Sequence, residues 1–315
     1  MKNLKTNKPR QMNKTPLKII ALIVIPILIA LIVRFVNSDS GTSISNKSSA
    51  KGKEDFLKLS DKSSIKILTS WLLPKELLEV SGISWMDGER FSCIQDELGK
   101  VYIFNIRLNK IELEITFAEK GDYEGIAIAG DILYVLDANG TIFEIGDYAN
   151  GNPKITVYKT HLKKKQDAES LAYDEKNNRL LIAVKAVDFN STEYKGIYAF
   201  DLKTKRMEES PVYKIDLSNK IFDKVNKGKI ENSIKPSDIA IHPLTGDIYI
   251  LEGTKPKLLI MNTKGKLISL YDLKGSDFPQ AEGIAFSADG KMYISNEGGN
   301  KEPGNILQVE LTKAN

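Results

Sequence analysis

From residue 63 onward, the apolar residues occur in short runs that are rich in β-branched and aromatic side chains. Gly, Asn and Asp separate these runs, and no stretch keeps the 3.6-residue period of an amphipathic helix. Runs of this kind are typical of β-strands that are bounded by tight turns. The pattern therefore predicts an all-β domain over residues 63–315.

One short pattern occurs five times in this domain. It reads SGISW at 81–85, EGIAI at 124–128, ESLAY at 169–173, SDIAI at 237–241 and EGIAF at 282–286. The first positions lie 43, 45, 68 and 45 residues apart, and a period near 44 is that of a four-stranded propeller blade. The long interval is one period plus an insertion, which we place in residues 188–195 and 218–235.

Each repeat continues with a second and a third strand, and four of the five repeats continue with a fourth. The last repeat ends without a fourth strand, whereas the segment 64–71 (SIKILTSW) precedes the first repeat and belongs to none. Pairing this segment with residues 304–311 would complete the last blade and remove its open edges. The sequence thus predicts a five-bladed β-propeller whose last blade is closed by an N-terminal strand.

The segment before the propeller predicts a membrane anchor. Residues 19–33 are all apolar and span roughly 22 Å as a helix, and the flanking residues extend this to a single transmembrane helix over 19–36. Residues 1–18 carry six bases and no acid, which predicts a cytoplasmic basic tail and an extracytoplasmic propeller. The alternative is a cleaved signal peptide. Residues 37–62 are rich in Ser, Lys and Gly, which predicts a flexible stalk.

The composition excludes several classes of site. A single cysteine, Cys93, and two histidines, His161 and His242, exclude a disulfide framework and a Cys-rich or multi-His metal centre. Beyond the basic tail, 39 bases face 41 acids, so the charge gives no reason to expect nucleic-acid binding. Neither Ser81 nor Ser237 has a histidine in register, so no Ser-His-Asp triad is expected.

The run QAEGIAFSADGKMYISNEGG at 280–299, with VSGISW, DYEGIAI, DAESLAY and PSDIAIHP at matching intervals, resembles the SdiA-regulated family. A membrane-anchored N-terminus followed by such a domain is also similar to that family. The resemblance implies a five-bladed propeller related to NHL repeats, with calcium bound in some members. It implies no established reaction.

In a propeller, the first strand of each blade lines the central channel, and the antiparallel second strand returns to the same rim. The candidate residues at this rim are, from the first strands, Ser81, Glu124, Glu169, Ser237 and Glu282, and from the second strands, Asp96, Asp137, Lys185, Glu252 and Glu297. One mouth of the channel is therefore expected to collect seven carboxylates and one lysine. Two carboxylates about 6 Å apart repel by roughly 3 kcal/mol, so such a ring requires protonation, separation or a cation.

We therefore expect calcium at Glu124, Glu169 and Glu282, because calcium accepts irregular sets of oxygen ligands. The other seven rim residues are then expected to bind a ligand at the channel mouth. The alternative is that the three glutamates cap neighbouring blades by accepting backbone N–H bonds. Lys185 either pairs with a ring carboxylate or contacts an anionic ligand.

These expectations combine into a membrane-anchored, extracytoplasmic binding module that holds an unidentified ligand or protein with calcium, without catalytic residues. The competing hypothesis is a calcium-dependent hydrolase of phosphoesters or lactones, because a calcium–carboxylate centre can activate water without histidine. We expect His242 in a loop, and we expect Trp85 and its counterparts in the other repeats to pack between blades.

Overall fold

The computed structural model describes residues 64–186, 188–189, 191–223, 225, 228–299 and 302–312. The predicted tail (1–18), anchor (19–36) and stalk (37–62) lie outside these residues. In the part of the chain that is described, no helix is long and apolar enough to cross a membrane.

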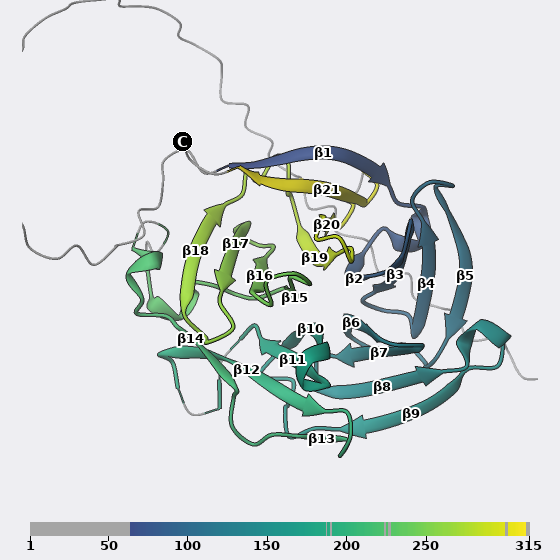
Figure 1. Ribbon diagram of the computed structural model, residues 1–315, viewed down its shortest axis with the longest axis horizontal. Helices are drawn as coiled ribbons and strands as arrows, with labels where there is room; N and C mark the ends of the chain where they lie inside the picture. The colour runs from purple at the N-terminus through teal and green to yellow at the C-terminus, as the bar shows by residue number, and fades with distance from the viewer. Residues whose placement is uncertain are drawn as a thin grey trace, which may run out of the picture. The chain divides into compact units, whose positions relative to one another are not determined.

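Five antiparallel sheets surround a central channel, as the repeat predicts (Figure 1). From the channel outward, the first blade holds β2 (Val80–Asp87), β3 (Arg90–Gln95), β4 (Lys100–Asn105) and β5 (Lys110–Thr116). The second holds β6 (Tyr123–Ala129), β7 (Ile132–Asp137), β8 (Thr141–Gly146) and β9 (Lys154–Lys159). The five-bladed all-β fold is thus confirmed.

In the third blade, β10 (Ala168–Asp174), β11 (Arg179–Val184) and β12 (Tyr194–Asp201) are followed by an outer strand in two pieces, β13 (Arg206–Met207) and β14 (Tyr213–Asp216). The fourth holds β15 (Asp238–Ile241), β16 (Ile248–Glu252), β17 (Lys257–Met261) and β18 (Leu267–Asp272). The fifth holds β19 (Ala281–Phe286), β20 (Met292–Asn296) and β21 (Asn305–Thr312). Short 3₁₀ turns lie at Lys75–Leu77, Tyr148–Asn150, Glu175–Asn177, Lys220–Phe222 and Ile230–Asn232.

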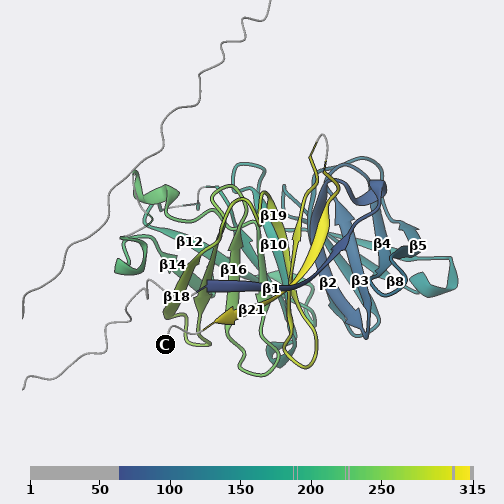
Figure 2. The same cartoon turned by 90° about the horizontal axis from the view of Figure 1, so that it is seen from above.

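The ring closes through its N-terminal strand. Strand β1 (Ser64–Leu72) pairs antiparallel with β21, from Ser64 opposite Thr312 to Leu72 opposite Asn305. Figures 1 and 2 both show the two strands side by side at the outer rim. This pairing confirms the predicted closure, and it gives the backbone groups of β21 partners that the fifth blade could not otherwise provide.

The blades meet most closely beside the channel. The third motif position is a branched aliphatic residue in every blade, and these five side chains are at most 3% exposed: Ile83, Ile126, Leu171, Ile239 and Ile284. Glycine at the second position allows the approach, because a Cβ at Gly125 would lie 2.7 Å from the Cβ of Leu171 in the next blade. The same holds for Gly283, where a Cβ would lie 3.0 Å from the backbone nitrogen of Ile83.

Candidate binding site at the channel mouth

The two motif serines connect neighbouring blades. The hydroxyl of Ser81 donates to the carbonyl oxygen of Tyr123 at 2.7 Å, and the hydroxyl of Ser237 donates to the carbonyl oxygen of Ala281 at 2.8 Å. Each accepting residue directly precedes a ring glutamate of the next blade. Because both serines are buried and their protons are engaged, they hold the ring together and offer no nucleophile.

The three ring glutamates do not cap neighbouring blades. Among the described residues, no backbone N–H donates to Glu124, Glu169 or Glu282. The single ion pair in this set joins Glu169 to Lys185, with 2.6 Å between Oε2 and Nζ. Glu124 and Glu282 accept no hydrogen bond within the described part of the chain, although both residues are half-buried.

The capping role belongs to Asp238, which the sequence analysis missed. Asp238 is 2% exposed, and its Oδ1 and Oδ2 atoms accept the backbone N–H groups of Ile239 and Ile284 at 2.8 Å each. It therefore connects the fourth blade to the fifth. Its position in the motif could have identified it, because the other repeats have glycine or serine there. Burial raises the pKa of Asp238 well above its ordinary range, although the hydrogen bonds oppose this shift.

Burial and like charges also raise the pKa values of the ring glutamates. Burial, together with repulsion from Glu169, raises the pKa of Glu124 to about 9. Burial raises the pKa of Glu169 to about 8, although the Lys185 ammonium favours its charged form. The pKa of Glu282 is raised by burial and opposed by the same ammonium. The mouth thus holds carboxylates that are costly to ionise unless a cation is near.

Lys185 is the cation that these carboxylates share. Burial alone would lower its pKa, but the charges of Glu169, Glu282 and Glu124 outweigh burial and leave the pKa raised. Its backbone is held by the buried Lys195, whose Nζ atom donates to the carbonyl oxygens of Lys185, at 2.7 Å, and Ala186. Lys185 is thus a charged residue whose backbone position is fixed by hydrogen bonds from Lys195.

The candidate residues at the ends of the second strands differ in whether their side chains are free to bind a ligand. Glu252 is 1% exposed, and its Oε2 accepts from the Lys257 ammonium at 2.6 Å and from the backbone N–H of Lys235 at 3.0 Å, so its carboxylate is already engaged. Asp137 accepts the backbone N–H of Asn139 at 2.9 Å and so supports a turn.

Asp96 and Glu297 remain beside the ring. Oδ1 of Asp96 is buried and has no hydrogen-bond partner among the described residues. Glu297 accepts from the side chain of Gln280, and burial, with repulsion from Glu282 and Asp96, raises its pKa to about 7. The carboxylates coupled to one another are therefore those of Glu124, Glu169, Glu282, Glu297 and Asp96.

A glycine makes room for one of these carboxylates. A Cβ at Gly253, directly after β16, would lie 2.7 Å from Oε1 of Glu282 in the next blade. No side chain can therefore occupy that position without displacing the Glu282 carboxylate.

The three ring glutamates offer carboxylate oxygens that accept no backbone N–H group among the described residues. Oxygen atoms of this kind are the ligands that a hard cation such as calcium prefers. The arrangement of the ring does not form a closed cage, since no three His, Cys, Asp or Glu side chains in the described part of the chain gather as a metal site. Glu169 is also engaged by Lys185. Glu124 and Glu282 are the groups that are left for an incoming cation.

The chain is similar to known proteins in sequence and in fold. A family model described as SdiA-regulated matches residues 79–301. A comparison with curated proteins finds no match. Among solved structures, the chain is similar to the glutaminyl cyclase of Myxococcus xanthus, with 14% identity and a TM-score of 0.55, over 80% of this chain and 98% of that one.

A second solved structure is the hydrazine synthase of Kuenenia stuttgartiensis, with 12% identity and a TM-score of 0.43, over 78% of this chain and 65% of that one. At such identities, the likeness to the cyclase concerns the fold alone, and the likeness to the synthase carries no argument.

Proposed function

Because this chain belongs to the SdiA-regulated family, and its propeller presents a ring of uncapped carboxylates, we propose that it is a binding module whose channel mouth takes up calcium. The observation that carries the proposal is that Glu124 and Glu282 are half-buried without any hydrogen bond in the described part of the chain, beside a buried Glu169 that has only Lys185. A cation that binds there relieves the repulsion among these groups. The bound ion would supply positive charge for an anionic group of a ligand.

Binding is favoured over catalysis by the state of the candidate nucleophiles. The hydroxyls of Ser81 and Ser237 donate to backbone carbonyl oxygens, and both histidines lie outside the ring. A calcium-dependent hydrolase is the competing activity. Assays with generic ester, lactone and phosphoester substrates, with and without calcium, distinguish the two, and turnover that Glu169→Gln abolishes would replace the binding proposal.

The calcium site is tested by thermal unfolding of the wild type and of Glu282→Gln, each in calcium and in chelator. Calcium should stabilise the wild type by mass action, by about 2.7 kcal/mol at a hundredfold excess over the dissociation constant. Glu282→Gln should lose most of this effect, yet in chelator it should be neutral or mildly stabilising because one buried charge is removed. A wild-type melting curve that does not respond to calcium would end the proposal.

We further propose that residues 19–36 anchor the protein in the cytoplasmic membrane, with the propeller on the extracytoplasmic side. The apolar run and the basic residues before it support this arrangement. Protease treatment from the outer side should remove a C-terminal tag from membrane fractions. Recovery of the tag on a soluble protein that lacks the first 40 or so residues would instead show signal-peptide cleavage.

A further inference from the structure

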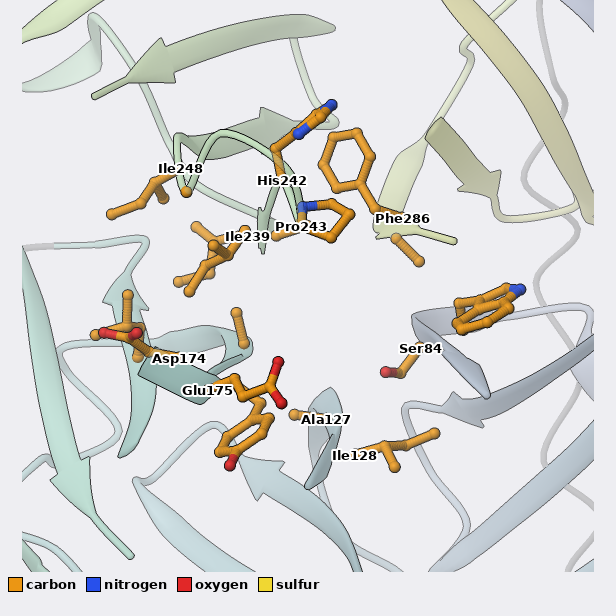
Figure 3. Close-up of a pocket in the computed structure, with 18 of the residues that line it drawn as sticks. Ser84, Ala127, Ile128, Asp174, Glu175, Ile239, His242, Pro243, Ile248 and Phe286 are labelled. Atoms are coloured by element: carbon orange, nitrogen blue, oxygen red, sulfur yellow. The ribbon is translucent and has the colours of Figure 1, made fainter. Parts of the chain in front are cut away.

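The end of the channel opposite the carboxylates opens into a cavity of about 940 Å³ (Figure 3). Its wall is formed by the last residues of the inner strands of all five blades and by the turns that follow them. Its volume lies at the upper end of the range for sites that enclose a small organic molecule. Nothing in the carboxylate site accounts for this space.

The floor of the cavity separates it from the carboxylate mouth. The five buried aliphatic residues at the third motif position, from Ile83 to Ile284, lie between the ring glutamates and the cavity along each inner strand. The next position is small in every blade, namely Ser84, Ala127, Ala172, Ala240 and Ala285. Small side chains at this level leave the space that larger ones would fill.

Large apolar side chains surround the opening. They occupy the fifth motif position, and each is only half-buried: Trp85, Ile128, Tyr173, Ile241 and Phe286. As predicted, each packs between blades, because the buried cluster that it joins combines residues of two neighbouring blades. The sequence analysis did not foresee that they also line a cavity. Leu244, in a turn of the fourth blade, adds an apolar side chain that is 71% exposed.

The polar atoms of His242 and Trp85 do not face this space. Nε2 of His242 lies beside the turn at Gly290, where a Cβ would be 3.3 Å away, and the ring is directed away from the centre of the cavity (Figure 3). Nδ1 of His242 accepts the backbone N–H groups of Leu244 and Thr245 at 3.3 Å each, so the neutral ring carries its proton on Nε2. The ring packs on Tyr249 and Phe286, with centroids 5.9 Å and 4.9 Å away, which fixes its orientation. Nε1 of Trp85 is buried and has no partner in the described part of the chain, so the indole lines the cavity with its apolar surface.

The charged groups on the wall do not favour an ion. Arg179 is paired with Asp174 at 2.8 Å, and Glu175 and Lys176 are adjacent and of opposite sign. A wall that combines large apolar side chains with balanced charges matches an uncharged ligand that has an apolar body.

We infer that this cavity is a second binding site, independent of the carboxylate mouth, for a small neutral molecule with a ring-sized apolar body. The apolar body contacts the fifth-position side chains.

The probe for the test is 6-propionyl-2-(dimethylamino)naphthalene, a neutral, planar and fluorescent ketone. The chain has two tryptophans, so full-length protein with Trp71→Phe leaves Trp85 as the energy donor. Saturable energy transfer from Trp85 to the probe is expected. Ser84→Phe, which fills the cavity, should abolish the saturable part, whereas Glu114→Gln on the exposed outer strand of the first blade should leave it unchanged.

Ala240→Leu fills the cavity from another blade and serves if Ser84→Phe does not fold, as judged by circular dichroism. Transfer that never saturates, or saturable transfer that survives a folded cavity-filling variant, would overturn the inference.

Discussion

The Nζ atom of Lys185 lies 2.6 Å from Oε2 of Glu169, where strand β10 begins and β11 has just ended. At the corresponding register the other four blades carry carboxylates, so Lys185 brings a positive charge into a ring of negative ones. The same ammonium interacts electrostatically with Glu124 and Glu282. Lys185 therefore supplies the positive charge that a bound cation would supply, and calcium must compete with its ammonium group for the ring carboxylates.

Removal of this ammonium should make the protein more dependent on calcium. In chelator, Lys185→Met should lose about 1–3 kcal/mol of stability, because Glu169 loses its partner while most of its surface stays buried. In calcium, the variant should recover, with an affinity for the ion about tenfold higher than that of the wild type. Thermal unfolding against calcium concentration measures both effects.

The matched control is Lys100→Met, which removes an exposed ammonium 3.1 Å from Glu114. This variant should leave both the stability and the response to calcium unchanged, because an ion pair exposed to water contributes little. Equal calcium affinity in Lys185→Met and the wild type would show that Lys185 does not compete with the ion.

Stability in chelator should fall as pH rises from about 5 to 9. The pKa values of Glu297, Glu169 and Glu124 are raised from 4.5 to about 7, 8 and 9, so in this window the folded chain holds protons that the unfolded chain has released. The stability that these three glutamates contribute is fully present below pH 4.5 and is lost as the pH rises through each raised pKa. Each group contributes up to about 1.4 kcal/mol per pH unit within its own window.

Denaturant unfolding as a function of pH measures this slope. Glu124→Gln should flatten it and should exceed the wild type in stability at pH 9, whereas Glu114→Gln on an exposed outer strand should keep the wild-type slope. A wild type whose stability rises over the same window would contradict the assignment of these groups as buried and protonated.

Asp238→Ala should destabilise the propeller by about 2–4 kcal/mol, because the backbone N–H groups of Ile239 and Ile284 lose their acceptor in a buried position. Denaturant unfolding measures the loss. Asp289→Ala removes an exposed carboxylate paired with Lys291 and should leave the stability close to that of the wild type. Similar stabilities of the two variants would argue against the inter-blade role of Asp238.

A chain that begins at residue 75 should lose about 3–5 kcal/mol and much of its solubility, compared with one that begins at residue 60. The shorter chain lacks Ile65 and Ile67, which pack on the last blade, and Trp71, which contacts Tyr293. It also leaves β21 as an open edge. Identical melting curves for the two chains would show that β1 contributes little to closure.

The blade order and the closure were predictable because both follow from a repeat with a fixed period. The ion pair between Glu252 and Lys257 could also have been predicted, since the two residues face each other across one hairpin. By contrast, the hydrogen bond from Lys195 to the backbone of Lys185 could not be predicted, because it depends on an insertion that is not part of the repeat. The cavity was missed because half-burial of Trp85 and its counterparts depends on the width of the channel, which apolar patterning does not encode.

The pairing of Ser64 with Thr312 also has a consequence for synthesis of the protein. At about 5–20 residues per second, the ribosome produces the partner of β1 more than ten seconds after β1 itself. During that interval the first strand has a free edge, and the fifth blade cannot form. Assembly of the ring must therefore end with its two most distant strands, and factors that protect nascent β-strands would act on this chain until translation is nearly complete.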